Sequence, residues 1–379
     1  MQSIVSRRML SLFVLIFASL AVCPAYANNA EQCTPEFPFK DGWWGGDAAY
    51  SIPLADGRTV WIFGDTLYGD KRVVVGKDPR MTHNSIGIST CKNGKWNVEY
   101  VIKRSPDGAP ADFFPPRVKG TWYWALDGVR VKDELWITLL CIRPSTSSES
   151  EALGFETCGA DLARVRGLGS DAQKWQVTNY PLVADGVKAY PSSTTVVEGK
   201  HLYLFALYES GKRPLLVTRI PLAGLNAPAK NLQYLAKGGK WKPGFKPEDA
   251  QEVMAQGNSE MSIRYHAGRK QWLAVLNEPG LFTDKILLRT APNLTGPWTD
   301  GQVIYRIPDV QKDAPGYDPD TFCYAGKEHP QFRQADSVLV TYACNTQKVA
   351  KLTTNLNIYY PKAVRITLPK PVESSASSN

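Results

Sequence analysis

The hydrophobic positions of this chain gather in short runs that are rich in β-branched and aromatic residues, and each run is bounded by Gly, Asp, Asn or Pro. Turn dipeptides such as Asp56-Gly57 and Asn93-Gly94 fall between the runs. A helical period is hard to find beyond the N-terminal segment. The pattern therefore predicts an all-β fold. The predicted strands cover residues 59–63, 85–89, 134–140, 201–208, 271–276, 285–290 and 337–343.

A loose internal repeat narrows the predicted architecture. A strand ending near Arg or Thr is followed by a variable loop and then by a small residue and a tryptophan, with spacings of 79, 66 and 57 residues between the tryptophans. Such a unit has the length of a four-stranded propeller blade with its loops, and the chain holds about five of them. The sequence predicts a five-bladed β-propeller, with a pair of two-sheet sandwiches as the alternative. The tryptophans are Trp96, Trp175, Trp241 and Trp298.

The two ends of the chain differ from the rest. Arg7 and Arg8 precede an apolar run over residues 10–22, and Ala-Tyr-Ala at 25–27 has the pattern of a cleavage site, so residues 1–27 are expected to be a secretory signal peptide. Acylation at Cys23, as in a lipoprotein, is the alternative. We expect one propeller domain over residues 28–369 and a disordered tail over 370–379. The fragment at 359–369 is expected to complete a blade with N-terminal sequence, which would remove free sheet edges.

Six cysteines remain after the signal peptide, and an even number in an exported chain favours disulfides over metal ligands. None of them forms a Cys-x-x-Cys pair, so a zinc site has little support. Six cysteines allow fifteen connectivities. The expected pairs are Cys141–Cys158 and Cys323–Cys344, where intervening turns let the ends meet, and Cys33–Cys91, which would tie the mature N-terminus to the body.

The formal net charge of +8 comes from dispersed basic residues and not from basic runs. This distribution argues against a nucleic-acid partner. No stretch after the signal is long and apolar enough for membrane insertion. The eleven tryptophans and seventeen tyrosines suit stacking on sugars, although a propeller core also needs large rings. We expect a secreted or periplasmic monomer with a polysaccharide partner and no cofactor.

The segment from residue 42 to residue 68 carries the strongest candidate chemistry. It holds Asp47 and Asp65, eighteen residues apart, each flanked by glycine and joined through a turn that would bring both carboxylates to one end of the sheet. Glycosidic cleavage needs two carboxyl groups, one protonated and one ionised. The alternative is that each aspartate caps a turn. Trp43 and Trp44 would bind sugar or form an apolar wall that raises the pKa of the acid.

Four further polar residues are expected to bind substrate, because they stand where inner strands of a propeller would meet the central channel. Three of them have a structural alternative, because Asp-Gly is a common hairpin turn, an asparagine at a strand end can cap, and a lone histidine is usually structural. The glutamate could be an acid or an acceptor for a sugar hydroxyl. The four residues are Asn84, Asp127, Glu260 and His329.

Several segments resemble the bacterial family of endo-D-arabinanases, which is related to the five-bladed propeller superfamily of arabinanases, β-xylosidases and invertases. They include "GGDAAYSIPLADGRTVWIFGDT", "WYWALDG", "NSEMSIRYH", "CYAGKEHPQF" and "YYPKAVRITL", and the resemblance spans residues 40–368. It implies that Asp47 and Asp65 are the essential carboxylates and that Asp127, Glu260 and His329 line the same funnel. It also implies endo-acting hydrolysis of the D-arabinan in arabinogalactan or lipoarabinomannan, or of another furanose-containing glycan.

Other classes of protein fit less well. A sialidase needs Ser-x-Asp-x-Gly-x-x-Trp boxes, which are absent from the sequence, and no phosphate site of a glycan phosphorylase is visible. A non-catalytic sugar-binding propeller stays open, with Trp43, Trp44 and Tyr324 as stacking platforms. An axial calcium ion has no dense acidic run to bind it, and Asp318 and Asp320 are interpreted as a turn. Whether cleavage is endo or exo, and whether it retains or inverts configuration, stays open.

Overall fold

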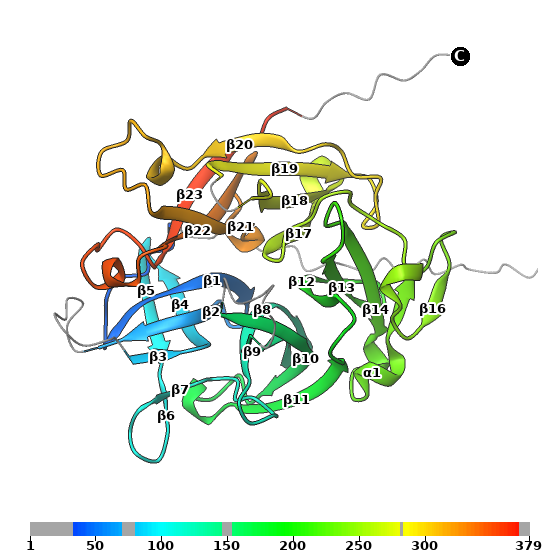
Figure 1. Ribbon diagram of the computed structural model, residues 1–379, viewed down its shortest axis with the longest axis horizontal. Coiled ribbons are helices and arrows are strands. Elements are labelled where there is room, and N and C mark those ends of the chain that lie inside the picture. The colour runs from blue at the N-terminus through cyan, green and yellow to red at the C-terminus, as the bar shows by residue number, and fades with distance from the viewer. Residues whose placement is uncertain (1–32, 70–79, 146–153, 281–282, 371–379) are drawn as a thin grey trace, which may run out of the picture. The chain divides into compact units, whose positions relative to one another are not determined.

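The computed structural model describes residues 33–69, 80–145, 154–280 and 283–370. Five antiparallel sheets in this part of the chain are arranged around a common axis, which is the predicted five-bladed β-propeller (Figure 1). The predicted signal peptide and residues 371–379 of the predicted tail lie outside the described residues. None of the helices in the described part is long and apolar enough to cross a membrane.

Each blade is one sheet whose strands follow one another in the chain from the axis outward. The first two blades contain β1 (Trp43–Pro53), β2 (Thr59–Tyr68), β3 (Arg80–Thr82), β4 (Ser85–Lys92) and β5 (Lys95–Val101), then β8 (Trp122–Val131), β9 (Glu134–Pro144), β10 (Phe155–Arg166) and β11 (Gln176–Val183). The short strands β6 (Lys103–Arg104) and β7 (Pro110–Ala111) pair with each other in the segment of chain that connects these two blades.

The third blade contains β12 (Ala189–Glu198), β13 (His201–Tyr208), β14 (Leu215–Pro221), β15 (Gln233–Leu235) and β16 (Trp241–Pro243), with the one-turn helix α1 (Pro228–Asn231) in a loop. The fourth contains β17 (Met261–His266), β18 (Gln271–Asn277), β19 (Lys285–Ala291) and β20 (Gln302–Arg306). The fifth contains β21 (Thr321–Glu328), β22 (Ser337–Thr346) and β23 (Pro361–Thr367).

Position within a blade explains the burial of each strand. The inner strands β1, β8, β12, β17 and β21 gather near the axis (Figure 1), and most of their residues are buried on both faces. The outer strands β5 and β11 alternate with exposed residues, as expected for strands with one solvated face. The repeated tryptophans stand at or just before the outermost strands. Trp96 lies in β5, Trp175 precedes β11, Trp241 begins β16 and Trp298 precedes β20.

The ring closes differently from the prediction. β23 pairs with β22 of its own blade, and within the described residues no N-terminal strand joins that sheet. The Cys33–Cys91 disulfide ties the segment before β1 to β4 of blade 1. Side chains join the last blade to the first instead. Phe332 stacks on Trp61 with 5.9 Å between ring centroids.

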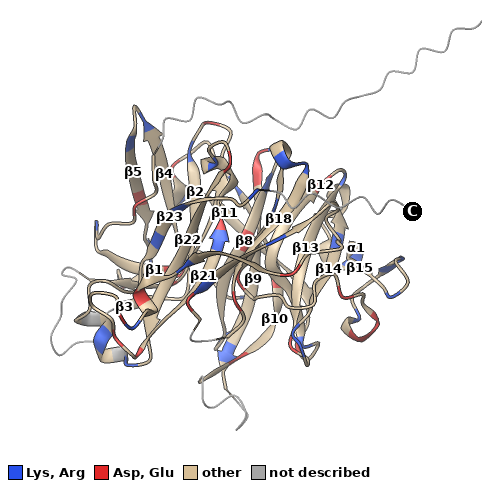
Figure 2. Ribbon diagram, turned by 90° about the horizontal axis from the view of Figure 1, so that it is seen from above, with Lys and Arg blue, Asp and Glu red and all other residues tan. Residues whose placement is uncertain are grey.

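The three expected disulfides are confirmed. Cys141–Cys158 links β9 to β10, Cys323–Cys344 links β21 to β22, and Cys33–Cys91 ties the segment before β1 to β4. Figure 2 shows lysine, arginine and acidic residues scattered over strand ends and loops, in agreement with the dispersed charge of the sequence.

Candidate active site

A bulge in the innermost strand of blade 1 positions Asp47. β1 pairs with β2, and its register slips between Gly46 and Ala48, so the side chain of Asp47 leaves the regular alternation of the strand. It lies against Gly64 of β2, where an added Cβ would stand 2.4 Å from Asp47 Oδ1. Gly64 therefore makes the space that the carboxyl occupies. The same hairpin carries Asp65, the residue after this glycine.

The environment of Asp47 favours the protonated acid. Its Oδ2 accepts a hydrogen bond of 2.7 Å from the hydroxyl of Tyr324 in β21. Burial, followed by the charges of Asp65 and Glu260, raises the pKa of Asp47 well above the ordinary value of 3.8, against the opposing effects of Tyr324 and Lys327. The residue is nevertheless partly accessible to solvent. A carboxylic acid that holds its proton and can be reached is the form that donates protons.

Asp65 occupies a different and more polar environment. Its Oδ1 accepts a hydrogen bond of 3.0 Å from Trp124 Nε1 and lies 3.1 Å from His83 Nδ1. The ring of His83 stacks on Trp122, and its main-chain N–H donates to Asp112 Oδ1 at 2.8 Å. The side chain of Asp65 is 24% exposed, so these contacts orient the carboxyl without closing it off.

Glu260 brings a third carboxyl group to the same place from the loop before β17. Its Oε1 lies 3.7 Å from the ammonium of Lys327, which is an ion pair beyond hydrogen-bond distance, and this oxygen has no hydrogen-bond partner. Burial raises the pKa of Glu260, while Lys327 lowers it. The charge of Glu260 also acts on Asp47. The structure thus brings together three of the eight predicted site residues, Asp47, Asp65 and Glu260.

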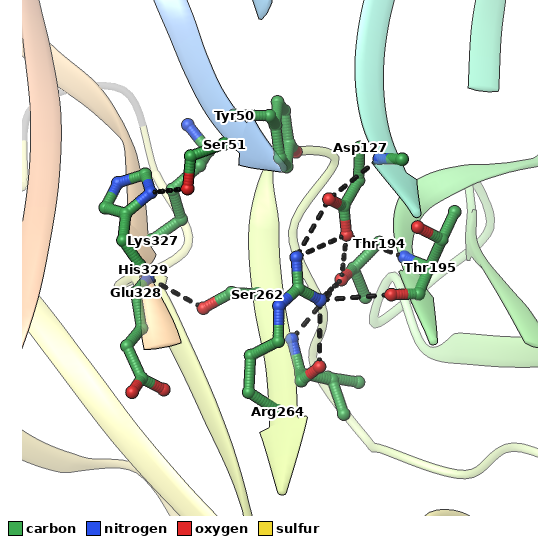
Figure 3. A network of polar contacts seen from close by, with 12 residues as sticks. Tyr50, Ser51, Asp127, Thr194, Thr195, Ser262, Arg264, Lys327, Glu328 and His329 are labelled. Carbon is green, nitrogen blue, oxygen red and sulfur yellow. Dashed lines mark hydrogen bonds and ion pairs between the residues drawn. The ribbon is translucent and has the colours of Figure 1, made fainter. Parts of the chain in front are cut away.

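Asp127 belongs to a buried network beside this cluster (Figure 3). Arg264 donates to both of its carboxylate oxygens at 2.8 and 2.9 Å. The hydroxyl of Thr194 and the main-chain N–H of Thr195 each donate at 2.7 Å, and the N–H of Gly128 donates at 2.9 Å. With no exposed surface, Asp127 links β8, β12 and β17 and cannot contact a substrate from this position.

Two further predicted residues lie in the core of blade 1. Trp43 has no exposed surface and stacks face to face on Tyr100, with 4.0 Å between centroids. Asn84 is also fully buried; it donates to the carbonyl of Tyr123 at 2.9 Å and accepts from the N–H of Phe114 at 2.7 Å. Both side chains are fully buried inside the protein, so the structure corrects the expectation that they bind sugar.

His329 and Trp44 are buried as well. Both ring nitrogens of His329 have partners, Ser51 Oγ at 2.6 Å (Figure 3) and Thr341 Oγ1 at 2.7 Å. Burial lowers the pKa of His329 well below its ordinary value, so the ring is neutral. The indole of Trp44 donates to the carbonyl of Gly69 at 3.1 Å. A polar residue on an inner strand can face a neighbouring blade as well as the channel, and these residues face the protein interior.

Sequence reasoning missed several groups that contact the carboxyl cluster. The sequence suggested Tyr324 only as a stacking platform and gave His83 no role in the site. Trp124 and Lys327 lie in segments that carry the resemblance but were given no role, and the register slips in β8 and β21 hide their direction from a simple count along the strand. The hydroxyl of Tyr359 donates to the carbonyl oxygen of Asp65 at 3.1 Å, a contact that depends on a residue near the end of the chain.

Four of the eleven non-glycine residues with a left-handed backbone in the described part of the chain lie around the cluster. Ala48 and Ala49 follow Asp47 with φ of 61° and 58°, Ala325 follows Tyr324 with φ of 61°, and Tyr359 has φ of 63°. Each such non-glycine residue is strained, and the surrounding structure must hold it in place. Strain of this kind gathers at functional sites, so the backbone points to the same region as the carboxyl groups.

Metal ligands have little support in the described part of the chain. The group found there with suitable spacing is Asp309 with Cys323 and Cys344, and a disulfide joins these two cysteines. The main-chain N–H of Asp320 donates to Asp318 Oδ1 at 3.0 Å, which agrees with the interpretation of these residues as a turn.

The fold and the site define a five-bladed β-propeller whose axial region holds a cluster of carboxyl groups with unequal surroundings. The chain belongs to the family described as Domain of unknown function (DUF5005), which it matches over residues 36–368. No curated protein matches the chain significantly.

Solved structures are similar in fold. A Bacteroides ovatus protein described as a candidate hydrolase is 16% identical, with a TM-score of 0.66 and 86% of each chain covered. The xylan β-1,4-xylosidase of Bacillus halodurans is 8% identical, with a TM-score of 0.45 over 81% of this chain and 50% of that one. The α-L-arabinofuranosidase of Podospora anserina is 10% identical, with a TM-score of 0.44 over 89% and 95%. The first of these supports the propeller fold; the other two bear on neither activity nor substrate.

Proposed function

We propose that this protein is a secreted or periplasmic glycoside hydrolase that cleaves furanosidic linkages within a polysaccharide, with Asp47 and Asp65 as its catalytic pair. The observation that carries the proposal is the unequal environment of two carboxyl groups on one hairpin. Asp47 is driven toward its protonated form by burial and by neighbouring negative charge. Asp65 is partly exposed and accepts hydrogen bonds at a fixed position. Glycosidic cleavage needs one protonated carboxyl group that donates a proton and one ionised carboxylate that acts as nucleophile or base.

In this mechanism Asp47 is the general acid and protonates the leaving glycosidic oxygen. Asp65 acts on the anomeric carbon, either directly as a nucleophile or as a base that activates water. The indole N–H of Trp124 and the ring of His83 hold the Asp65 carboxyl in place. Tyr324 orients Asp47 through its hydrogen bond. Fixed orientation of both groups accounts for much of the rate that such a pair achieves.

D-Arabinan of the arabinogalactan or lipoarabinomannan type is the proposed substrate. The support is the resemblance of the segments around Asp47 and Asp65 to endo-D-arabinanases. Three disulfides support an oxidising compartment outside the cytosol, where such glycans are found. Endo action and a monomeric protein remain part of the proposal.

The test is release of oligosaccharides from purified arabinogalactan and lipoarabinomannan by the purified protein, beside Asp47→Asn, Asp65→Asn and the control Asp107→Asn. Asp107 is an exposed turn residue far from the cluster in sequence and in contacts. We expect wild type and the control to release products. Each of the other two variants should lose about 10²-fold or more of the activity, the usual contribution of a general acid or base.

The size of the products tests endo action, because a ladder of oligosaccharides requires internal cleavage whereas a single small sugar indicates exo cleavage. Equal activity in Asp47→Asn and wild type would contradict the assignment of the acid. Binding of the glycan by all four proteins without product release would replace the proposal with a non-catalytic sugar-binding propeller. Neither binding nor release would direct the search to other furanose-containing glycans.

A further inference from the structure

The side chain of Lys327 ends inside the protein beside the carboxyl cluster. Only 1% of the residue is exposed, although lysine is among the residues least often buried. Its ammonium donates to the carbonyl oxygens of Ala48 and Ala325, the latter at 2.5 Å, and lies 4.4 Å from the ring centroid of Tyr50. Both carbonyls belong to residues in the left-handed conformation. The strained backbone at these two positions thus directs carbonyl oxygens at one ammonium.

The remaining partners of this ammonium are carboxyl groups. Glu260 Oε1 lies 3.7 Å from it and has no hydrogen-bond partner of its own. The charge of Asp47 also acts on Lys327. Asp127 is more fully compensated, because Arg264 binds both of its oxygens. Lys327 is therefore the cation available to Asp47 and Glu260 within the described cluster.

A role in stability alone explains this arrangement poorly. Burying an ammonium carries a desolvation penalty, and a well-packed apolar residue often serves stability as well or better. A link through Lys327 between the fifth blade and the first is also not needed, because Phe332 and His329 already join these two blades. A positive charge that is fixed by carbonyls and faces two carboxyls controls where negative charge resides.

We propose that Lys327 is a positioning residue of the candidate active site, whose buried ammonium limits how far burial disfavours the charged forms of Asp47 and Glu260 and so sets the pH range in which the site works. The inference rests on the proposed function. Other titratable and charged groups face the same region from every neighbouring strand. They are Tyr50 of β1, Asp65 of β2, Asp127 of β8, Arg264 of β17, Tyr324 of β21, His329 and Tyr359.

Lys327→Met is the decisive substitution, because methionine keeps the unbranched shape and removes the charge. Lys327 lowers the pKa of both Asp47 and Glu260. Without it the pKa of Asp47, the proposed general acid, rises, so the alkaline limb of the pH profile of kcat/KM should move to higher pH. Lys242→Met is the matched control, since Lys242 lies in β16, the outer strand of blade 3, is half exposed and pairs with Asp249; its profile should match wild type.

A second measurement does not depend on activity. Infrared difference spectra recorded against pH follow the band of protonated carboxylic acids, which should persist to higher pH in Lys327→Met than in wild type. Coincident limbs together with coincident infrared titrations would overturn the inference while leaving the hydrolase intact. If no glycan is cleaved at all, the proposed function fails, and the infrared titration still decides whether Lys327 sets the charge of the cluster.

Thermal unfolding separates a positioning role from a purely structural one. A structural link predicts a lower melting temperature and a uniform loss of activity with unmoved limbs. If Lys327→Met does not fold, Glu260→Gln replaces it as the test. Removing the charge of Glu260, which raises the pKa of Asp47, should move the limb governed by Asp47 to lower pH. An unmoved limb and an unmoved infrared titration in Glu260→Gln would then overturn the inference.

Discussion

Replacing Gly64 with alanine would displace the Asp47 carboxyl without removing it. Gly64 lies in β2 opposite the bulge of β1, and its missing side chain leaves the space into which Asp47 Oδ1 projects. Its backbone does not need a left-handed φ, so alanine introduces no backbone strain. The nearest backbone and core atoms are also far enough away. An added Cβ would be 3.8 Å from Ala48 Cβ, an ordinary contact.

The expected loss of activity follows from the size of the clash. The new Cβ would stand 2.4 Å from Asp47 Oδ1, and ordinary contacts begin at 3.4 Å, so the oxygen must retreat by about 1 Å. A catalytic group misplaced by that distance costs about 10²-fold in rate. Stability should change little, because the atom that moves is the end of a side chain. Replacing glycine with alanine also restricts the unfolded chain, which raises the free energy of unfolding by about 0.4–1 kcal/mol.

The assay compares kcat/KM for D-arabinan and the melting temperature of Gly64→Ala with those of Gly169→Ala. Gly169 is the matched control, because its backbone is also free of a positive φ and an added Cβ there meets no atom within 4 Å. Wild-type kcat/KM in Gly64→Ala would refute the role of Asp47 in this position. A large fall in melting temperature would instead show that the clash is absorbed by the sheet.

Three other predictions test the surroundings of the site. Arg264→Met leaves the fully buried Asp127 without its cation, and urea denaturation should show a loss of about 3–5 kcal/mol in the free energy of unfolding; a loss near zero would contradict the network. The raised pKa of Asp47 means that the folded protein holds a proton that the unfolded chain releases above about pH 3.8, so this contribution to stability is complete in acid and lost as pH rises through the folded pKa. Asp47→Asn should therefore melt above wild type at alkaline pH, with the difference vanishing in acid; calorimetry across pH decides. Replacing both Cys33 and Cys91 with serine opens a loop of 58 residues and should cost about 4 kcal/mol in the same urea assay, unless the unfolded chain is already compact there.

Much of the fold was predictable because its signals are local. Short β-rich runs, turn dipeptides and the tryptophans at the outer-strand turns of four blades depend on residues close together in the chain. The disulfide pairs could be inferred for the same reason, since Cys141–Cys158 and Cys323–Cys344 span 17 and 21 residues. Ring closure was predicted wrongly, because it depends on where the segment before β1 runs after Cys33 is joined to β4.

The sequence by itself determined a five-bladed propeller and singled out the hairpin that carries Asp47 and Asp65, because both depend on spacing along a short stretch of chain. Tertiary structure alone decided which polar residues of the inner strands face the cluster. Glu260 reaches it, whereas Asp127 and His329 are held in the protein interior. Register slips turn individual side chains of these strands, and neighbouring blades supply their partners from residues far away in sequence. The carbonyls that hold Lys327 in place arise from the same slips, so no spacing along the chain reveals them.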